Sequence, residues 1–212
     1  MPAQISLALK GDCSGLILDG GHIPASQDQV RATLTFPPAP ANKSLSVSIE
    51  GHASVAGRDI VRQAVPADDM VQAFMYHHLV PAREMIAEVS GSNRGRAPIK
   101  LLSTAPMVLK AGGTGRALLS LQGRSPFVIA ETQLQLSEPP DGISIDGISL
   151  AANGATISFK ADATKVKPGA KGNLIVEQFV ERTPPAVNGK TPEKRRFSIG
   201  FLPAIPFEVA GK

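Results

Sequence analysis

The segment from Phe74 to Ala82 reads Phe-Met-Tyr-His-His-Leu-Val-Pro-Ala, and the segment from Phe197 to Ala204 reads Phe-Ser-Ile-Gly-Phe-Leu-Pro-Ala. Each begins with Phe, ends with Pro-Ala and precedes a similar short run, Glu-Val-Ser-Gly at 88–91 and Glu-Val-Ala-Gly at 208–211. Similarity at a fixed place in two halves of a chain is typical of an internal repeat. These two segments therefore direct the interpretation toward architecture before chemistry.

Four further pairs of blocks occur in the same order in the two halves. They are Gln4–Leu7 with Gln133–Leu136, Gly15–Gly20 with Gly142–Gly147, Ala32–Phe36 with Ala155–Phe159, and Leu45–Glu50 with Leu174–Glu177. Each pair is weak by itself, because alternating strands resemble one another by chance. Their shared order predicts that the chain consists of two structural repeats.

Short strands are expected along the whole chain. Apolar and polar residues alternate at Ile5–Lys10, Val30–Phe36 and Leu45–Glu50, a period of two that is typical of strands with one buried face. Clusters of Gly, Pro, Asn and Asp separate these runs. The pattern predicts an all-β protein, with one short helix at Pro66–Phe74, where a proline and the acidic pair Asp68-Asp69 suit a first helical turn.

The repeat predicts two tandem immunoglobulin-like β-sandwich domains, residues 1–92 and 93–212, joined through Gly91–Ala97. The second repeat has two extra strands before its first matching block, at 105–109 and 115–121, separated by a turn at Gly112-Gly113. The first repeat has no counterpart for them, so we expect an incomplete first sandwich, as in the C-terminal part of a longer polypeptide. The sheet edge that this leaves exposed could pair with another chain and form a homo-oligomer.

Composition excludes some classes of function. The 212 residues include no Trp and one Tyr, and aromatic residues make up 4%, which disfavours the stacking platforms of carbohydrate and single-stranded nucleic-acid sites. Residues 1–92 carry six Lys and Arg against nine Asp and Glu, and residues 93–212 carry sixteen against nine. The single Cys13 cannot form an intrachain disulfide, and the chain shows neither a signal peptide nor an apolar run long enough to span a membrane.

The run Ala64–Phe74 followed by Tyr76, His78, Leu79 and Pro81 resembles the C-terminal region of large secreted bacterial proteins that carry pre-peptidase-type domains. The segments Val166–Glu177 and Leu202–Val209 are similar to the same family. This resemblance covers nearly the whole chain. It implies tandem immunoglobulin-like domains and an extracytoplasmic location in the periplasm, at the cell surface or outside the cell, and it supplies no catalytic residue.

The best candidates for chemistry are the pair His77-His78 and the pair Asp68-Asp69, which could bind zinc or form a base–carboxylate pair. Adjacent residues of a strand point to opposite faces, so both histidines cannot bind one metal, and His22 or His52 would have to approach from elsewhere. The Asp residues at 19, 68–69, 141 and 146 lack the spacing of a calcium loop. We therefore predict no catalytic residue, no cofactor and no metal ligand.

Two further features have an ordinary structural interpretation. The glycine-rich run 112–115 lacks the Gly-Lys-Ser/Thr ending of a phosphate loop and fits a hairpin turn. The basic segments Lys165–Lys171 and Lys190–Arg196, the second at the end of a long connection, fit solvated loops that could contact an acidic partner.

The segment Ala64–Ala82 is then expected to form a lid, with Met70, Phe74, Met75 and Leu79 covering an open core and Tyr76 burying its ring. The functional prediction is a non-catalytic structural or protein-interaction module of a secreted or cell-surface protein, which contacts other domains or a protein partner and no nucleic acid. A carbohydrate- or cell-wall-binding module and an accessory domain of an upstream peptidase are the alternatives.

Overall fold

The computed structural model describes residues 3–11, 15–36, 43–73, 75–89, 99–103, 105–121, 129, 132–183 and 193–211. The elements with bounds in these ranges are all β-strands, which confirms the all-β prediction. Residues 3–89 are called the first half below, and residues 99–211 the second half. The predicted link at Gly91–Ala97 lies outside the described residues, as does Cys13.

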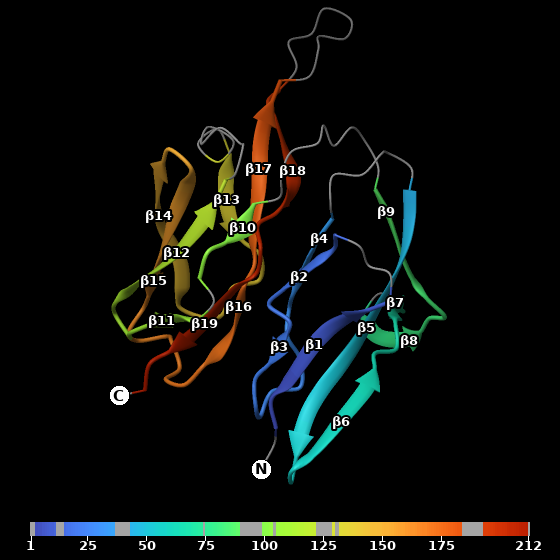
Figure 1. Cartoon of the computed structure of the whole chain (residues 1–212). Helices are drawn as coiled ribbons and strands as arrows, with labels where there is room; N and C mark the ends of the chain where they lie inside the picture. The colour runs from blue at the N-terminus through green and yellow to red at the C-terminus, as the bar shows by residue number, and fades with distance from the viewer. Residues whose placement is uncertain are drawn as a thin grey trace, which may run out of the picture.

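Within the described residues, the first half contains nine strands and the second half ten; Figure 1 shows their arrangement. Those of the first half are β1 Ile5–Lys10, β2 Ile17–Asp19, β3 His22–Ile23, β4 Thr33–Thr35, β5 Lys43–Val55, β6 Arg58–Gln63, β7 Ala67–Gln72, β8 Tyr76–Pro81 and β9 Met85–Val89. Those of the second half are β10 Lys100–Leu101, β11 Met107–Leu109, β12 Thr114–Ser120, β13 Gln133–Leu136, β14 Ile143–Ala151, β15 Gly154–Ala161, β16 Lys171–Leu174, β17 Val176–Arg182, β18 Arg195–Phe201 and β19 Ile205–Val209.

The second half encloses a hydrophobic core between three sheets, ordered β10-β12-β15-β14, β11-β19-β16 and β13-β17-β18. Strand β15 shows why, since its alternate residues, Ala155, Ile157, Phe159 and Ala161, are all buried. The core cluster is Met107, Leu109, Ala117, Leu119, Leu121, Ile129, Leu136, Ile143, Ala155, Ile157, Phe159, Ala161, Val166, Leu174, Val176, Leu202, Ile205, Phe207 and Val209. Because alternate side chains of a strand point to opposite faces, the alternation of apolar and polar residues in these strands places the apolar ones together in a closed interior.

The first half has no such interior. Its strands form a sheet ordered β3-β1-β5-β6, with β9 also paired to β5, and two separate pairs, β2-β4 and β7-β8. Among its described residues, Val47 is the one buried large hydrophobic side chain. Its exposed large hydrophobic residues are Val55, Ile60, Val61, Val65, Met70, Val71, Met75, Tyr76, Leu79, Val80 and Ile86. Apolar surface that strands normally bury therefore remains in contact with water.

The predicted helix at Pro66–Phe74 is wrong for every residue of it that the structure describes. Residues Ala67–Gln72 form strand β7, which pairs in antiparallel register with β8, and Phe74 lies outside the described residues. A helix of nine residues gains few hydrogen bonds for the cost of nucleation. The hairpin instead pairs all six residues of β7, and Ala73 makes the turn with a positive φ of 50°.

The turn at Gly112-Gly113 is not a hairpin turn between paired strands. Strand β11 pairs in parallel with β19, whereas β12 pairs with β15, so this connection joins two different sheets. The Gly113 N–H donates to Lys110 O at 2.8 Å and the Gly112 N–H to Ala161 O at 2.8 Å, which holds the connection against β15.

The pairing of β5 with β9 in the first half has the same residue register as the pairing of β16 with β19 in the second half. Ser44 lies opposite Glu88 and Val47 opposite Met85; in the second half Lys171 lies opposite Glu208 and Leu174 opposite Ile205. Strands β5 and β9 therefore occupy the places of β16 and β19. The next stretch of β5 continues as the equivalent of β17, with residue 50 in the place of residue 177.

Two of the predicted block pairs are aligned differently in the structure. Leu7 and Leu9 pair with β5 as Leu134 and Leu136 pair with β17, so the first block is shifted by two residues from the sequence alignment. The sequence similarity between residues 74–82 and residues 197–204 also matched two strands that are not structurally equivalent. Strand β18 pairs with β17, whereas β8 pairs with β7.

The equivalent of β18 in the first half is β6. The Ala64 N–H donates to Ile49 O at 2.8 Å directly after β6, and the Leu202 N–H donates to Val176 O at 2.9 Å directly after β18. The chain then enters β19 within three residues in the second half, whereas the β7–β8 hairpin intervenes before β9 in the first. The hairpin is thus an insertion, closed by a hydrogen bond from the Ala82 N–H to Pro66 O at 2.8 Å.

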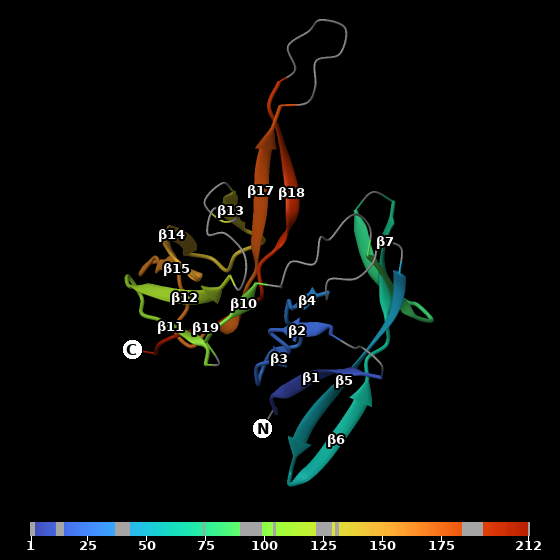
Figure 2. The same cartoon turned by 45° about the horizontal axis from the view of Figure 1, so that its top comes forward.

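A group of polar contacts joins the two halves on the side where β2, β3 and β4 face the second half (Figure 2). The Asn173 side chain donates to Gly20 O and Arg31 O, both at 2.7 Å, and the Ala204 N–H donates to the Thr33 hydroxyl at 2.8 Å. Gly20 has a φ of 78°, and a Cβ there would lie 2.8 Å from the Ala204 Cβ, so the contact requires glycine.

The same contact region gains two hydrogen bonds and an ion pair from Arg31. Its guanidinium donates to Ser137 O at 2.6 Å and to the Ser137 hydroxyl at 3.0 Å, and it lies 3.4 Å from a Glu138 carboxylate oxygen. Gln27 adds a hydrogen bond to Lys171 O at 2.8 Å. Hydrogen bonds to backbone acceptors are geometrically selective, so these contacts fix how the halves sit on one another.

The unequal cores lead to a stability prediction. Ile157 is fully buried, so Ile157→Ala should lower the free energy of unfolding by about 2–5 kcal/mol. The matched change Ile60→Ala, at an exposed position of β6, should cost less than about 1 kcal/mol. Urea unfolding followed by circular dichroism measures both. Equal losses would contradict the assignment of the core to the second half alone.

A second prediction concerns Asp19, which is half-buried at the end of β2. Burial raises the pKa of its carboxyl above the ordinary 3.8, so the folded state holds the proton more tightly than the unfolded state. Stability from this group is complete below about pH 4 and is lost as the pH rises through the raised pKa. Asp19→Asn should therefore raise the melting temperature near neutral pH and leave it unchanged in acid.

The control for Asp19→Asn is Asp59→Asn, which removes a charge from an exposed position of β6. It should change the melting temperature little at either pH. A gain for Asp19→Asn that is equally large in acid would show that its cause is not the carboxylate charge.

Candidate functional site

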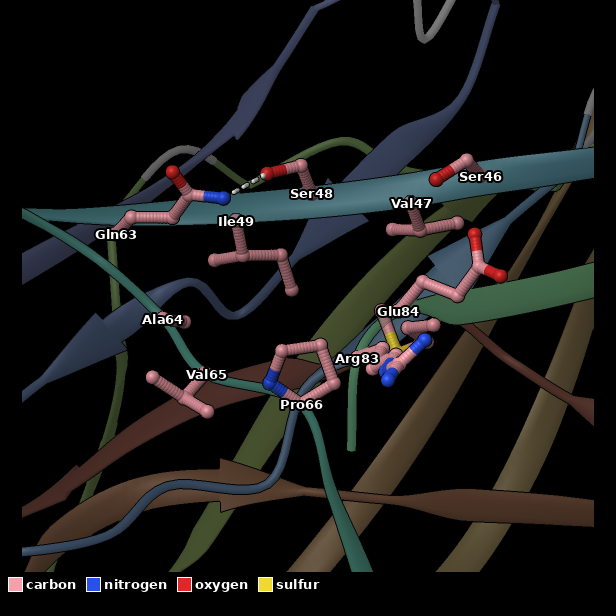
Figure 3. A pocket seen from close by; sticks show the side chains of 11 residues that line it. Ser46, Val47, Ser48, Ile49, Gln63, Ala64, Val65, Pro66, Arg83 and Glu84 are labelled. Atoms are coloured by element: carbon pink, nitrogen blue, oxygen red, sulfur yellow. Dashed lines mark hydrogen bonds between the residues drawn. The ribbon is translucent and has the colours of Figure 1, made fainter. Parts of the chain in front are cut away.

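An open groove lies in the first half where β5, the end of β6 and the start of β9 meet (Figure 3). Its volume is about 260 Å³. Val47 and Ile49 project from one face of β5 toward Pro66 on the opposite wall, while Ser46 and Ser48 lie on the other face of the strand. The lining residues are Ser46, Val47, Ser48, Ile49, Gln63, Ala64, Val65, Pro66, Arg83, Glu84 and Met85.

The groove occupies the place that the buried core takes in the second half. By the shared register and the matching hydrogen bonds after β6 and β18, the apolar positions Val47, Ile49, Ala64 and Met85 are equivalent to Leu174, Val176, Leu202 and Ile205. All four of the second set are buried, whereas only Val47 of the first set is, and Val65, next to Ala64, is 69% exposed. The groove is thus the uncovered counterpart of a protein core.

The difference arises from the strands that cover these positions. In the second half, β11 and β12 contribute Met107, Leu109, Ala117 and Leu119 to the core. Strand β11 also pairs with the outer edge of β19. Within the described part of the first half, β9 is paired with β5 alone, so its other edge has unpaired backbone groups.

The β7–β8 hairpin carries apolar side chains on both faces. Met70, Tyr76 and Val80 are on one face and Val71 and Leu79 on the other, because residues paired across the ladder share a face. All five are at least 41% exposed. An isolated two-stranded hairpin is marginal in water, so this one needs packing that the described residues do not provide.

The predicted lid is therefore not closed in this structure. Tyr76, Met75 and Leu79 are 70%, 78% and 72% exposed, so they do not cover the open groove. The expectation that Tyr76 buries its ring is wrong for the same reason. The pairing of β7 with β8 explains why the prediction of a lid was wrong. Met75, Tyr76 and Leu79 belong to an inserted hairpin and not to the segment that leads into a closing strand.

The histidines lie in three separate places. In β8, His77 and His78 point to opposite faces, as expected for a strand; the His77 Nδ1 lies 3.1 Å from an Asp69 carboxylate oxygen, and both side chains are exposed. His52 in β5 lies 3.0 Å from the Glu50 carboxylate. His22 in β3 lies 3.2 Å from the Ser6 hydroxyl. The pair Asp68-Asp69 is on β7 rather than at a helix start.

These arrangements do not combine into a reaction centre. Ser6 and His22 resemble a nucleophile and its base, but no carboxylate among the described residues hydrogen-bonds to His22 to orient its ring. The pair His77–Asp69 lies on an exposed hairpin, where water screens its interaction. Within the described ranges, no group of three or more His, Cys, Asp or Glu is placed to bind a metal.

The junction of the two halves has two shallow grooves of about 410 and 490 Å³ that share Lys171, Gly172, Asn173 and Phe207. Lys171 lies 2.9 Å from the Glu208 carboxylate at this place. Sequence reasoning did not single out Asn173 or Arg31 here, because a lone Asn or Arg in a strand pattern carries no signal of its contacts. Since Asn173 and Arg31 already bind backbone across the junction, we assign these grooves to the attachment of the halves.

The basic segments have internal partners where the structure describes them. In the turn before 165–171, hydrogen bonds from the Thr164 hydroxyl and its backbone N–H hold the pKa of the Asp162 carboxyl below its ordinary value, with Lys165 and Lys160 adding to the effect. Arg196 in β18 stacks 3.6 Å above the Phe179 ring and donates to the Gln135 side chain at 2.9 Å. Residues 190–192 of the second segment lie outside the described residues.

No family model matches this chain, and comparison with curated proteins and with solved structures finds no match either. The resemblance to the C-terminal region of secreted bacterial proteins therefore stays a prediction. In the described part of the chain, no helix is long and apolar enough to cross a membrane.

Proposed function

We propose that this chain is a non-catalytic protein-interaction module whose first half binds a polypeptide partner through its uncovered apolar surfaces. The observation that carries the proposal is the contrast between two equivalent sets of core positions, buried in the second half and open in the first. Large contiguous apolar surface on a protein in water marks a place where another molecule packs.

The fold that we propose with this function is a pair of tandem immunoglobulin-like sandwiches. The shared ladder registers of β5 with β9 and of β16 with β19 support it, as do the equivalent pairings of β1 with β5 and β13 with β17. In this proposal the second unit is complete, whereas the first has its second layer supplied by the partner.

The nature of the exposed surface favours a polypeptide over a glycan. The exposed side chains are aliphatic residues and methionines, with Tyr76 the one aromatic ring of the described hairpin. Sugar rings bind mainly on aromatic faces, which this surface lacks. The resemblance to secreted proteins supports a location outside the cytoplasm, where the module would hold or space other polypeptides.

Site-specific photo-cross-linking tests the proposed function. A photoreactive amino acid at position 79, on the hairpin, should form a covalent adduct with another polypeptide in cells of the natural source, because Leu79 is 72% exposed and apolar. The same group at position 150, on β14 of the complete second half, is the control, since Leu150 is exposed beside a closed core.

The expected result is an adduct that depends on position 79 and that contains polypeptide when analysed by mass spectrometry. Adducts of equal yield at positions 79 and 150 would contradict the proposal. Cross-linking to glycan alone would favour the carbohydrate-binding alternative. A glycan array with strong, saturable binding would support that alternative independently.

A further inference from the structure

We propose that the open groove of the first half is a strand-acceptor site. It takes an extended segment of a partner polypeptide, with apolar side chains at alternate positions, added in parallel to the outer edge of β9. This inference rests on the proposed function and specifies its site, its ligand class and its geometry.

The second half shows what such a ligand looks like. Strand β11 lies parallel to β19, with residues 107, 108 and 109 opposite residues 207, 208 and 209. Met107 and Leu109 are buried in the core, whereas Val108 between them is 59% exposed. A strand therefore covers this edge by inserting every second side chain and by pairing its backbone.

The acceptor has the same geometry in the first half. Strand β9 has the register of β19, so its residues 87, 88 and 89 would lie opposite the added strand, as residues 207, 208 and 209 lie opposite β11. Beside this edge, the groove offers Val47, Ile49 and Met85 as the floor that Leu174, Val176 and Ile205 form in the second half. Both requirements of strand addition, an unpaired edge and an adjacent apolar pocket, meet at one place.

The size and lining of the groove fit aliphatic side chains. A cavity of about 150 Å³ is enough to bind benzene, so 260 Å³ accommodates one or two apolar side chains. Its floor is apolar, and its polar residues stand at the margins: Ser46, Ser48, Gln63, Arg83 and Glu84. The ligand is therefore a peptide strand with aliphatic residues directed inward, since a charged side chain would lose its hydration at this floor.

The experiment uses the full chain and a fluorescent peptide with the sequence of residues 105–121, which contains β11 and β12. Saturable binding by fluorescence anisotropy is expected, with changes in the backbone amide NMR signals of Met85–Val89. In the peptide, Leu109→Asp should weaken binding at least about tenfold, because this side chain enters the groove. The matched peptide Val108→Asp should bind within about twofold of the original, because that side chain faces water.

Variants of the protein locate the site. Val65→Asp places a charge on the groove wall and should weaken peptide binding at least about tenfold, and the fold should tolerate it because Val65 is 69% exposed. The control Val71→Asp puts the same charge on the hairpin, outside the groove, and should leave binding within about twofold.

Four outcomes would overturn the proposal. The first two are the absence of peptide binding and peptide binding that is unchanged by Val65→Asp. The third is a set of NMR changes confined to the second half, which would mean that the peptide replaces β11. The fourth is self-association of the peptide-free chain through β9. A peptide that does not bind, together with a polypeptide cross-link at position 79, would refute this site while leaving the proposed function intact.

Discussion

A β-sheet with one apolar face is stable in water only when something covers that face, and the whole molecule depends on how each half meets this requirement. The second half meets it internally, because β11 pairs with the outer edge of β19 and both β11 and β12 contribute side chains to the closed core. The first half has the equivalent framework strands in the same register but leaves their apolar side chains open. Burial of apolar area is the main favourable term in folding, so this difference dominates the relative stability of the two halves.

The first half is held in place by polar contacts rather than by a core. Asn173 and Arg31 bind backbone across the junction, so the first half is anchored to the half that contains the closed hydrophobic core. Hydrogen bonds of this kind fix orientation but contribute modestly to stability. The second half thus supports the first, whose open groove and β7–β8 hairpin remain exposed.

The sequence predicted the features that depend on local periodicity. Alternation along residues 5–10, 30–36 and 45–50 predicted strands, and the all-β fold is confirmed. The division into two tandem repeats stays a prediction. Features that depend on pairing partners were not predictable. The similarity of 74–82 to 197–204 concealed an inserted hairpin, because two alternating segments that end in Pro-Ala look alike whether their strands pair with β17 or with β7. The two extra strands of the second repeat predicted an open core in the first half, whereas the lining of the groove by Val65 and Pro66 was visible only in the structure.

Native-state hydrogen exchange tests the central claim most directly, by comparing the equivalent strands β9 and β19 within one molecule. The amides of Ile205 and of residues 207–209 should exchange only through global unfolding, because their strand lies in a closed core. Amides of Met85–Val89 should exchange through local opening of much lower free energy, because one edge and the adjacent groove are open. Equal protection of the two strands in the isolated chain would contradict the account, since it would show that the first half is already covered.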